Sequence, residues 1–114
     1  MSPRTNPSIK ALRKAAPVFA ALGDETRMRL IAVLCAGSAL SIAQLTDGTV
    51  NTRQAVTKHL QVLADAGLVR DIKQGRERLW EFEPTRLEEA RRSLEMVAQQ
   101  WDQALMRLKR KLEC

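Results

Sequence analysis

Side-chain patterning changes twice along this 114-residue chain, and the two changes limit the folds that it can adopt. Up to Gly67, apolar residues recur at the three-to-four-residue spacing of helices that bury one face. In residues 68–82, β-branched and aromatic residues flank Gln74-Gly75, which predicts a hairpin with Gly75 at positive φ. Helical spacing returns at Pro84. The sequence therefore predicts a mainly α fold of about five helices with one small two-stranded β-hairpin.

The first helix is predicted over Ile9–Leu22, and Pro17 falls inside it. Proline removes a backbone donor and clashes with the preceding turn. Either the helix kinks at this point, or its regular part begins with Pro17 in the first turn. Residues 1–8, with two prolines among polar residues, are expected to be a flexible segment. Residues 9–114 are expected to form a single domain.

Residues that commonly cap helices mark three further helix starts. Asp24 is expected to begin the second helix and Ser41 a short third one. The apolar stripe of the second helix is predicted at Met28, Ile31, Leu34 and Cys35. Asn51, with Gln54 three positions later, resembles a capping box for a fourth helix that reaches about Ala66. A short helix, a tight turn and a longer helix together make a helix-turn-helix.

The last helix is predicted over residues 84–112 and carries apolar positions at alternating intervals of three and four. A chain this short cannot easily cover so long a stripe with its own core, and a second copy is the simplest partner. This helix is therefore expected to make a homodimer. The predicted dimer interface consists of Leu87, Ala90, Leu94, Val97, Trp101, Ala104 and Leu108.

Composition and charge narrow the class of protein. The net charge is +6, from 19 Lys and Arg against 13 Asp and Glu, and it is spread along the chain. Such a surplus suits a polyanionic partner, although ribosomal, membrane-surface and simply soluble proteins share it. We find no secretory signal and no apolar run of roughly 18 residues, so we expect a cytoplasmic protein with no membrane partner.

The predicted fourth helix is amphipathic, and its polar face has the chemistry of DNA recognition. At about 100° per residue, Val56, Leu60 and Leu63 fall on one face. The opposite face carries Arg53, Gln54, Thr57, Lys58 and Gln61. Arginine and glutamine can make bidentate contacts with guanine and adenine, and threonine offers a methyl and a hydroxyl group. The alternative interpretation is a solvated face that contacts nothing.

The predicted hairpin, with strands Leu68–Lys73 and Arg78–Phe82, follows this helix closely. Basic residues near its tip could reach the DNA backbone or minor groove, as a wing does. The DNA-contacting residues predicted from the helix and the hairpin are Thr52, Arg53, Gln54, Thr57, Lys58, His59, Lys73, Arg76 and Arg78. Trp80, on the second strand, is expected to pack against the domain.

Three stretches resemble the ArsR/SmtB family of winged-helix transcriptional regulators: VFAALGDETRMRLIAVL, QAVTKHLQVLADAGLV and GRERLWEFEP. The resemblance runs from about Ala15 to Leu112. It implies a winged helix-turn-helix fold in which residues 51–66 are the recognition helix and residues 69–82 the wing. It also implies a homodimeric repressor, joined through its first and last helices, that binds an imperfectly palindromic operator in double-stranded DNA.

The chain lacks the residues of the metal sites in that family. Metal-sensing members carry a cysteine pair before the recognition helix, and the matching stretch SIAQLTD contains no cysteine. Another site in the family uses histidine with carboxylates on the last helix, and residues 84–114 contain no histidine. We expect neither a metal nor a cofactor. Cys35 could pair with Cys114 as a thiol switch, but a small buried hydrophobic residue is the favoured interpretation.

The leading hypothesis is therefore a sequence-specific, dimeric DNA-binding repressor. No paired carboxylates, glycine-rich phosphate loop or nucleophile–base motif indicates an enzyme. Two alternatives share the fold. One is a sensor that responds through a thiol or an unknown small-molecule effector. The other is a protein-interaction module that does not bind DNA.

Overall fold

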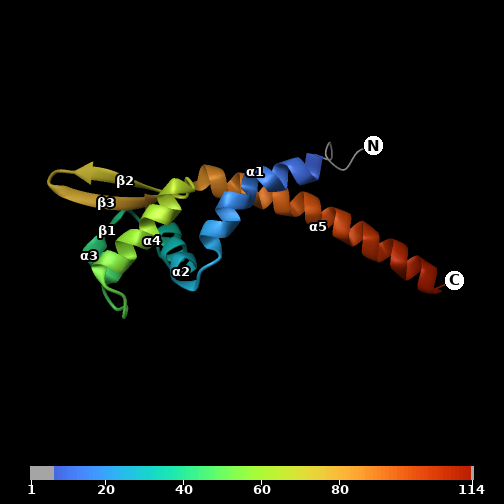
Figure 1. The fold of residues 1–114 in the computed structure, drawn as a ribbon, viewed down its shortest axis with the longest axis horizontal. Coiled ribbons are helices and arrows are strands. Elements are labelled where there is room, and N and C mark those ends of the chain that lie inside the picture. The colour runs from blue at the N-terminus through green and yellow to red at the C-terminus, as the bar shows by residue number, and fades with distance from the viewer. Residues whose placement is uncertain (1–6, 114) are drawn as a thin grey trace.

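The computed structural model describes residues 7–113, which contain five α-helices and three β-strands (Figure 1). In chain order these elements are α1 (Pro7–Leu22), α2 (Glu25–Ala36), β1 (Leu40–Ser41), α3 (Ile42–Thr46), α4 (Arg53–Asp65), β2 (Val69–Gln74), β3 (Glu77–Phe82) and α5 (Pro84–Glu113). The mainly α fold with a β-hairpin is as predicted. None of the described helices has the length and apolarity that crossing a membrane requires.

The sheet has one strand more than the sequence predicted. Strand β1 pairs antiparallel with β3, with Leu40 opposite Trp80 and Ser41 opposite Leu79. The sheet order is β1-β3-β2, so β3 is the central strand of three. A two-residue strand is too short to show periodicity in the sequence. It is identified only by its pairing with β3 in the structure. The hairpin is attached to the helical part through this strand and through the buried side chains of Leu79 and Trp80.

Helix α1 begins earlier than predicted and runs through its proline. It includes Pro7 and Ser8, which the sequence had assigned to a flexible segment, whereas residues 1–6 lie outside the described part of the chain. Pro17 lies within one continuous helix, so the alternative in which a regular helix starts at Pro17 is wrong. Proline is tolerated here although it removes one backbone hydrogen bond, because Ala15, Val18 and Ala21 on either side are buried.

Two predicted helix caps are confirmed and one is wrong. The Asp24 carboxylate accepts the backbone N–H of Arg27, and Ser41 forms a capping box with Gln44. Helix α4, in contrast, is capped by Thr52, whose hydroxyl oxygen accepts the N–H of Ala55 at 3.1 Å. Asn51 belongs instead to the turn before the helix, where its backbone N–H donates to the Thr49 hydroxyl.

A single apolar core joins the helices to the sheet. Its largest fully buried side chains are Leu30, Leu34, Val56, Leu60, Leu63 and Leu68. The stripe predicted for α2 is half right, because Ile31 and Leu34 are buried while Met28 is 58% exposed and Cys35 is exposed. Leu30 takes the place of Met28 in the core. The rest of the core contacts the side of α2 that carries Leu30. Helical spacing alone does not show which side of a helix meets the core.

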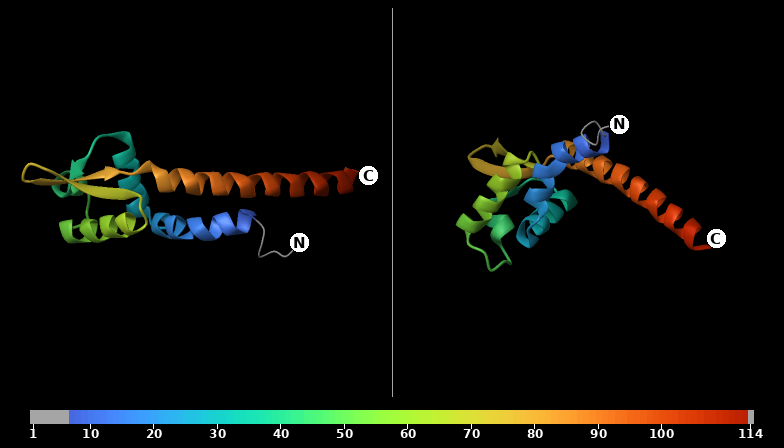
Figure 2. Two further views of the ribbon diagram at one scale, coloured as in Figure 1. Left: turned by 90° about the horizontal axis from the view of Figure 1, so that it is seen from above. Right: turned by 45° about the vertical axis from the view of Figure 1, so that its right-hand side comes forward.

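Helix α5 makes the molecule long, with extents of 66 × 28 × 21 Å. Its first half packs along α1, and its second half projects beyond every other element (Figures 1 and 2). Ala90 and Ser93 are the buried residues of this helix, and residues 98–113 are all exposed. A helix of this length normally buries a face along its whole course, so the second half of α5 is left without a partner in the single chain.

The corrected cap of the fourth helix gives a stability prediction. Thr52→Ala is expected to lower the free energy of unfolding by about 1 kcal/mol, because the N–H of Ala55 loses its acceptor. Asn51→Ala is the matched control, because the Asn51 side chain makes no hydrogen bond with any described residue. Chemical denaturation of both variants measures the difference. A loss for Asn51→Ala that equals or exceeds that of Thr52→Ala would contradict the assignment of the cap to Thr52.

Candidate nucleic-acid interface

The two faces of α4 are separated as the sequence predicted. Val56, Leu60 and Leu63 are 0% exposed, and they hold the helix against the core. Its opposite face is exposed along Arg53, Gln54, Thr57, Lys58 and Gln61. Helix α3 packs against α4 across a turn in which Gly48 adopts a positive φ of 76°. The helix-turn-helix thus presents the first two turns of α4 to solvent.

The exposed side chains of α4 differ in how free they are to bind a partner. Arg53, Gln54 and Lys58 make no side-chain hydrogen bond or ion pair with any residue between 7 and 113. The Thr57 hydroxyl donates to the Arg53 carbonyl oxygen at 2.8 Å, so its methyl group is the part left for a partner. Thr52 uses its hydroxyl oxygen to cap the helix, which leaves it less suited to the DNA contact that the sequence predicted.

His59 faces α2 rather than the exposed side of α4. Its Nδ1 lies 3.3 Å from an Arg27 guanidinium nitrogen, which donates to it, and 3.8 Å from the Asp24 carboxylate. Arg27 also donates to the Ala21 carbonyl oxygen near the end of α1. The backbone N–H of Arg27, more than the neighbouring charges, keeps the pKa of Asp24 below its usual value. His59 therefore lies in a junction of three helices, and the sequence carried no signal for that junction.

The wing has a two-residue tip of Gly75 and Arg76, with Gly75 at φ 65°. Lys73 and Arg76 are exposed and form no ion pair within the described part of the chain. Arg78 is also among the residues predicted to contact DNA, but its Nε donates to Asp71 at 2.7 Å and its guanidinium lies 5.6 Å from the Trp80 ring centre. Because Asp71 neutralises Arg78, the charge that the wing can offer to a polyanion is concentrated at its tip.

The predicted interface residues of α5 fall into three groups. Leu94, Trp101, Ala104 and Leu108 are exposed, with Trp101 at 64%, and Leu87 and Val97 are half-buried. Ala90 is only 1% exposed, so the prediction of an interface position is wrong for it, and it belongs to the core of its own chain against α1. The sequence did not single out Leu105, which is 49% exposed on the same stripe.

An apolar groove continues this stripe onto the body of the protein. Phe19, Leu22, Phe82, Leu87 and Leu94 line it. The rim carries an ion pair in which Arg91 lowers the pKa of Glu88 to about 2. The side chains of α1 and of the wing that line the groove come from segments far apart in sequence, so no local pattern could have identified them.

Cys35 also lines this groove, and it is exposed rather than buried as predicted. Partial burial raises the pKa of its thiol. Cys114, its suggested partner, lies outside the described residues. Among residues 7–113, no group of three or more His, Cys, Asp and Glu side chains is placed to hold a metal ion.

Comparisons with known proteins agree with this geometry. Residues 22–72 match a family described as a helix-turn-helix domain. The uncharacterized HTH-type transcriptional regulator YuzN of Bacillus subtilis is 39% identical over 71 residues, which are 57% of this chain and 77% of that protein. An ArsR-like transcriptional regulator from Rhodococcus sp. RHA1 superposes with a TM-score of 0.73 at 36% identity, covering 86% of this chain and 92% of that one. The chain belongs to the ArsR family.

As an ArsR-family protein, the chain is a transcriptional regulator with a winged helix-turn-helix DNA-binding domain. The relatives that it matches are regulators, which are not enzymes. A second solved structure shares the fold at 21% identity and a TM-score of 0.60 over 92% of this chain and 94% of that one. It is the homodimeric winged helix-turn-helix DNA-binding domain Mb0332 from Mycobacterium bovis.

The raised pKa of Cys35 gives a reactivity prediction. In a Cys114→Ser background, iodoacetamide should alkylate Cys35 more slowly at pH 8 than it alkylates free cysteine, because less of the thiol is ionised. The measurement is the alkylation rate as a function of pH, with the denatured protein as control. A rate midpoint at or below that of free cysteine would instead indicate an activated thiol.

Proposed function

We propose that this ArsR-family protein is a homodimeric repressor that binds a palindromic operator through α4 and the β2–β3 wing. The observation that carries the proposal is the arrangement of α4. Its apolar face is completely buried, while Arg53, Gln54 and Lys58 on its first two turns are exposed and unpaired within the described residues. A recognition helix uses the same turns to enter the major groove.

Each of these side chains suits a different part of DNA. Arg53 can bind the O6 and N7 atoms of guanine, and Gln54 can bind N6 and N7 of adenine. The Thr57 methyl group is placed for apolar contact with a thymine methyl, because its hydroxyl is already bonded to the helix backbone. Lys58 and the free N–H groups at the start of α4 suit phosphate. The proposed base readout therefore rests on Arg53, Gln54 and Thr57.

The wing supplies phosphate contacts in this proposal. Lys73 and Arg76 have free charges near the tip, and each phosphate contact adds affinity that depends on salt but not on sequence. Arg78 is proposed to hold the wing in shape through Asp71 and Trp80 rather than to lead the DNA contact. His59 is similarly assigned to the α2–α4 junction.

Dimerisation is proposed through the exposed stripe of α5. Trp101 and Leu105 lie on the half of α5 that no other element covers, and the stripe meets the groove beside Leu94. Burying such a stripe against a second copy gives a self-complementary interface. The Mycobacterium bovis domain of the same fold is homodimeric, which supports a homodimer here. Two recognition helices about 34 Å apart would then read successive major grooves and block the promoter.

Selection from randomised duplex DNA tests the proposed function. We expect an enriched inverted repeat whose half-sites lie about one helical turn apart. Gln54→Ala should relax the choice of one base in each half-site, at a cost of about 1–3 kcal/mol. Arg76→Ala should weaken binding to all sequences alike and reduce the slope of log affinity against log salt by about 1 per protomer.

Arg107→Ala is the charge-matched control for Arg76→Ala, because Arg107 lies on the projecting half of α5. It should leave both sequence choice and salt slope unchanged. Selection that enriches no sequence, together with unchanged binding by the Gln54 and Arg76 variants, would rule out this reading of α4 and the wing.

The dimer is tested by placing charge on the stripe. Trp101→Glu and Leu105→Glu should raise the dimer Kd at least roughly 30-fold, as expected at an interface hot spot worth about 2 kcal/mol. The protomer should keep its helicity because both side chains are exposed within it. Analytical ultracentrifugation with circular dichroism measures the two effects. Gln103→Glu is the control, since residue 103 lies roughly 160° around α5 from both positions. A wild-type protein that stays monomeric would contradict the proposal.

A further inference from the structure

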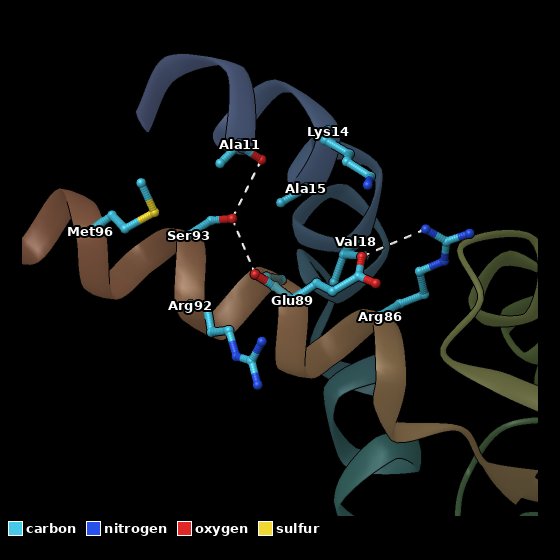
Figure 3. A pocket seen from close by; sticks show the side chains of 10 residues that line it. Ala11, Lys14, Ala15, Val18, Arg86, Glu89, Arg92, Ser93 and Met96 are labelled. Carbon is cyan, nitrogen blue, oxygen red and sulfur yellow. Dashed lines mark hydrogen bonds and ion pairs between the residues drawn. The ribbon is translucent and has the colours of Figure 1, made fainter. Parts of the chain in front are cut away.

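A second hollow lies between α1 and α5, and the proposed DNA interface does not use it (Figure 3). Its volume is about 240 Å³. It is lined by Ala11, Lys14, Ala15, Val18, Arg86, Glu89, Ala90, Arg92, Ser93 and Met96. An engineered apolar cavity of about 150 Å³ holds a benzene ring. The hollow therefore has room for one ring, or a short acyl chain, together with a polar head.

The interior of the hollow is apolar. Ala11, Ala15 and Val18 come from α1, and Ala90 and Met96 come from α5. Ser93 is the buried polar residue of α5, and its hydroxyl lies 3.1 Å from the Glu89 carbonyl oxygen and 3.4 Å from that of Ala11. Figure 3 shows this hydroxyl between the two helices. Because its proton is shared with backbone carbonyls, the interior favours the apolar part of a ligand.

The mouth of the hollow carries positive charge. Lys14 from α1 and Arg86 from α5 extend on the same side of Glu89 in Figure 3. Arg86 pairs with Glu89 at 3.6 Å across a solvated surface, and such pairs contribute little. Lys14 makes no ion pair with any residue that the structure describes. Arg92 also lines the hollow but pairs with Glu88 at 3.4 Å. Lys14 and Arg86 against Glu89 leave a net positive mouth, which suits an anionic head group.

The hollow and the proposed dimer stripe lie on different sides of α5. Arg92 and Met96 are each two residues from Leu94, which places them roughly 160° around the helix from it. Phe19 and Leu22 line the groove beside Leu94, whereas Ala11, Ala15 and Val18 line the hollow. Ala90 is shared by the groove and the hollow, but a partner that covers Leu94 and the stripe beyond it leaves the Arg92 and Met96 side of the hollow uncovered.

Arg86 connects the mouth to the DNA-reading part of the protein. Gly67, at φ 79°, forms the turn between α4 and β2. A Cβ atom at Gly67 would lie only 2.8 Å from Arg86 Cγ, so the stem of this arginine lies directly against the turn. Arg86 Nε would lie 3.4 Å from the same Cβ atom, so a ligand that reorients the guanidinium away from Glu89 changes the contact of this side chain with the junction of recognition helix and wing.

We propose that this hollow binds a small organic anion, a carboxylate on a single ring or short acyl chain, held by Lys14 and Arg86. Its occupancy changes DNA affinity through the contact of Arg86 with the turn at Gly67. The binding step is independent of the proposed repressor function, whereas the change in DNA affinity rests on it.

Two-dimensional NMR of the full chain tests binding with benzoate, phenylacetate and octanoate as probes and with neutral benzamide as control. At least one anion should shift the amide signals of Ala11, Ser93 and Gly67 in a saturable way, and benzamide should not. Lys14→Gln and Arg86→Gln should each weaken binding about tenfold or more, as expected for a charged hydrogen bond. Lys111→Gln, at the far end of α5, should have no effect.

Ala11→Leu provides a second variant, because its larger side chain should fill the hollow and abolish binding while leaving the charges in place. Absence of saturable shifts with all three anions, or equal shifts with benzamide, would overturn the proposed site. An anion that binds but leaves DNA affinity unchanged in the wild-type protein would overturn the coupling through Arg86 alone. The NMR result does not depend on the proposed repressor function. The result on DNA affinity is measured on a DNA sequence that the wild-type protein has been shown to bind, so a failure of coupling is distinct from a failure to bind DNA.

Discussion

Burial of one face of α4 is the constraint on which the rest of the structure depends. Val56, Leu60 and Leu63 are fully removed from solvent, and they pack among side chains from α2 and the start of β2. Because a helix has one rotational setting that buries these three residues, the direction of its opposite face is set as well. Arg53, Gln54 and Lys58 are exposed together for that reason, and their role in DNA reading is a consequence of core packing.

The wing illustrates how ion pairs redistribute a basic surface. Its strands and tip together contain four basic residues, but Arg70 pairs with Glu81 and Arg78 pairs with Asp71. These exposed pairs add little stability. Their effect is instead to concentrate the free charge at the tip and to keep Arg78 over Trp80. A basic hairpin in a sequence is therefore a poor guide to which of its cations meet phosphate.

Helix α5 serves two surfaces at once. Toward its beginning, small residues such as Ala90 and Ser93 allow close packing on α1 and leave the hollow with the charged mouth. Farther along, α5 extends past the beginning of α1, and larger apolar residues such as Trp101 are exposed. The heptad pattern runs through both regions as far as Leu108. A periodic stripe thus predicts an apolar face, but it does not show whether the same chain or a second copy covers that face.

Periodicity and capping chemistry in the sequence were sufficient to predict the helices, the hairpin and the two faces of α4. They also predicted the caps at Asp24 and Ser41. All of these features depend on residues within one or two turns of each other. The tertiary structure alone decided that Thr52 rather than Asn51 caps α4, and that Leu40 and Ser41 form a third strand. It also decided that Ala90 is core, that Cys35 is exposed and that His59 faces Arg27. Each of these outcomes depends on a contact between segments distant in sequence, or on competition between neighbouring residues for one backbone group. Local pattern has no information about such contacts.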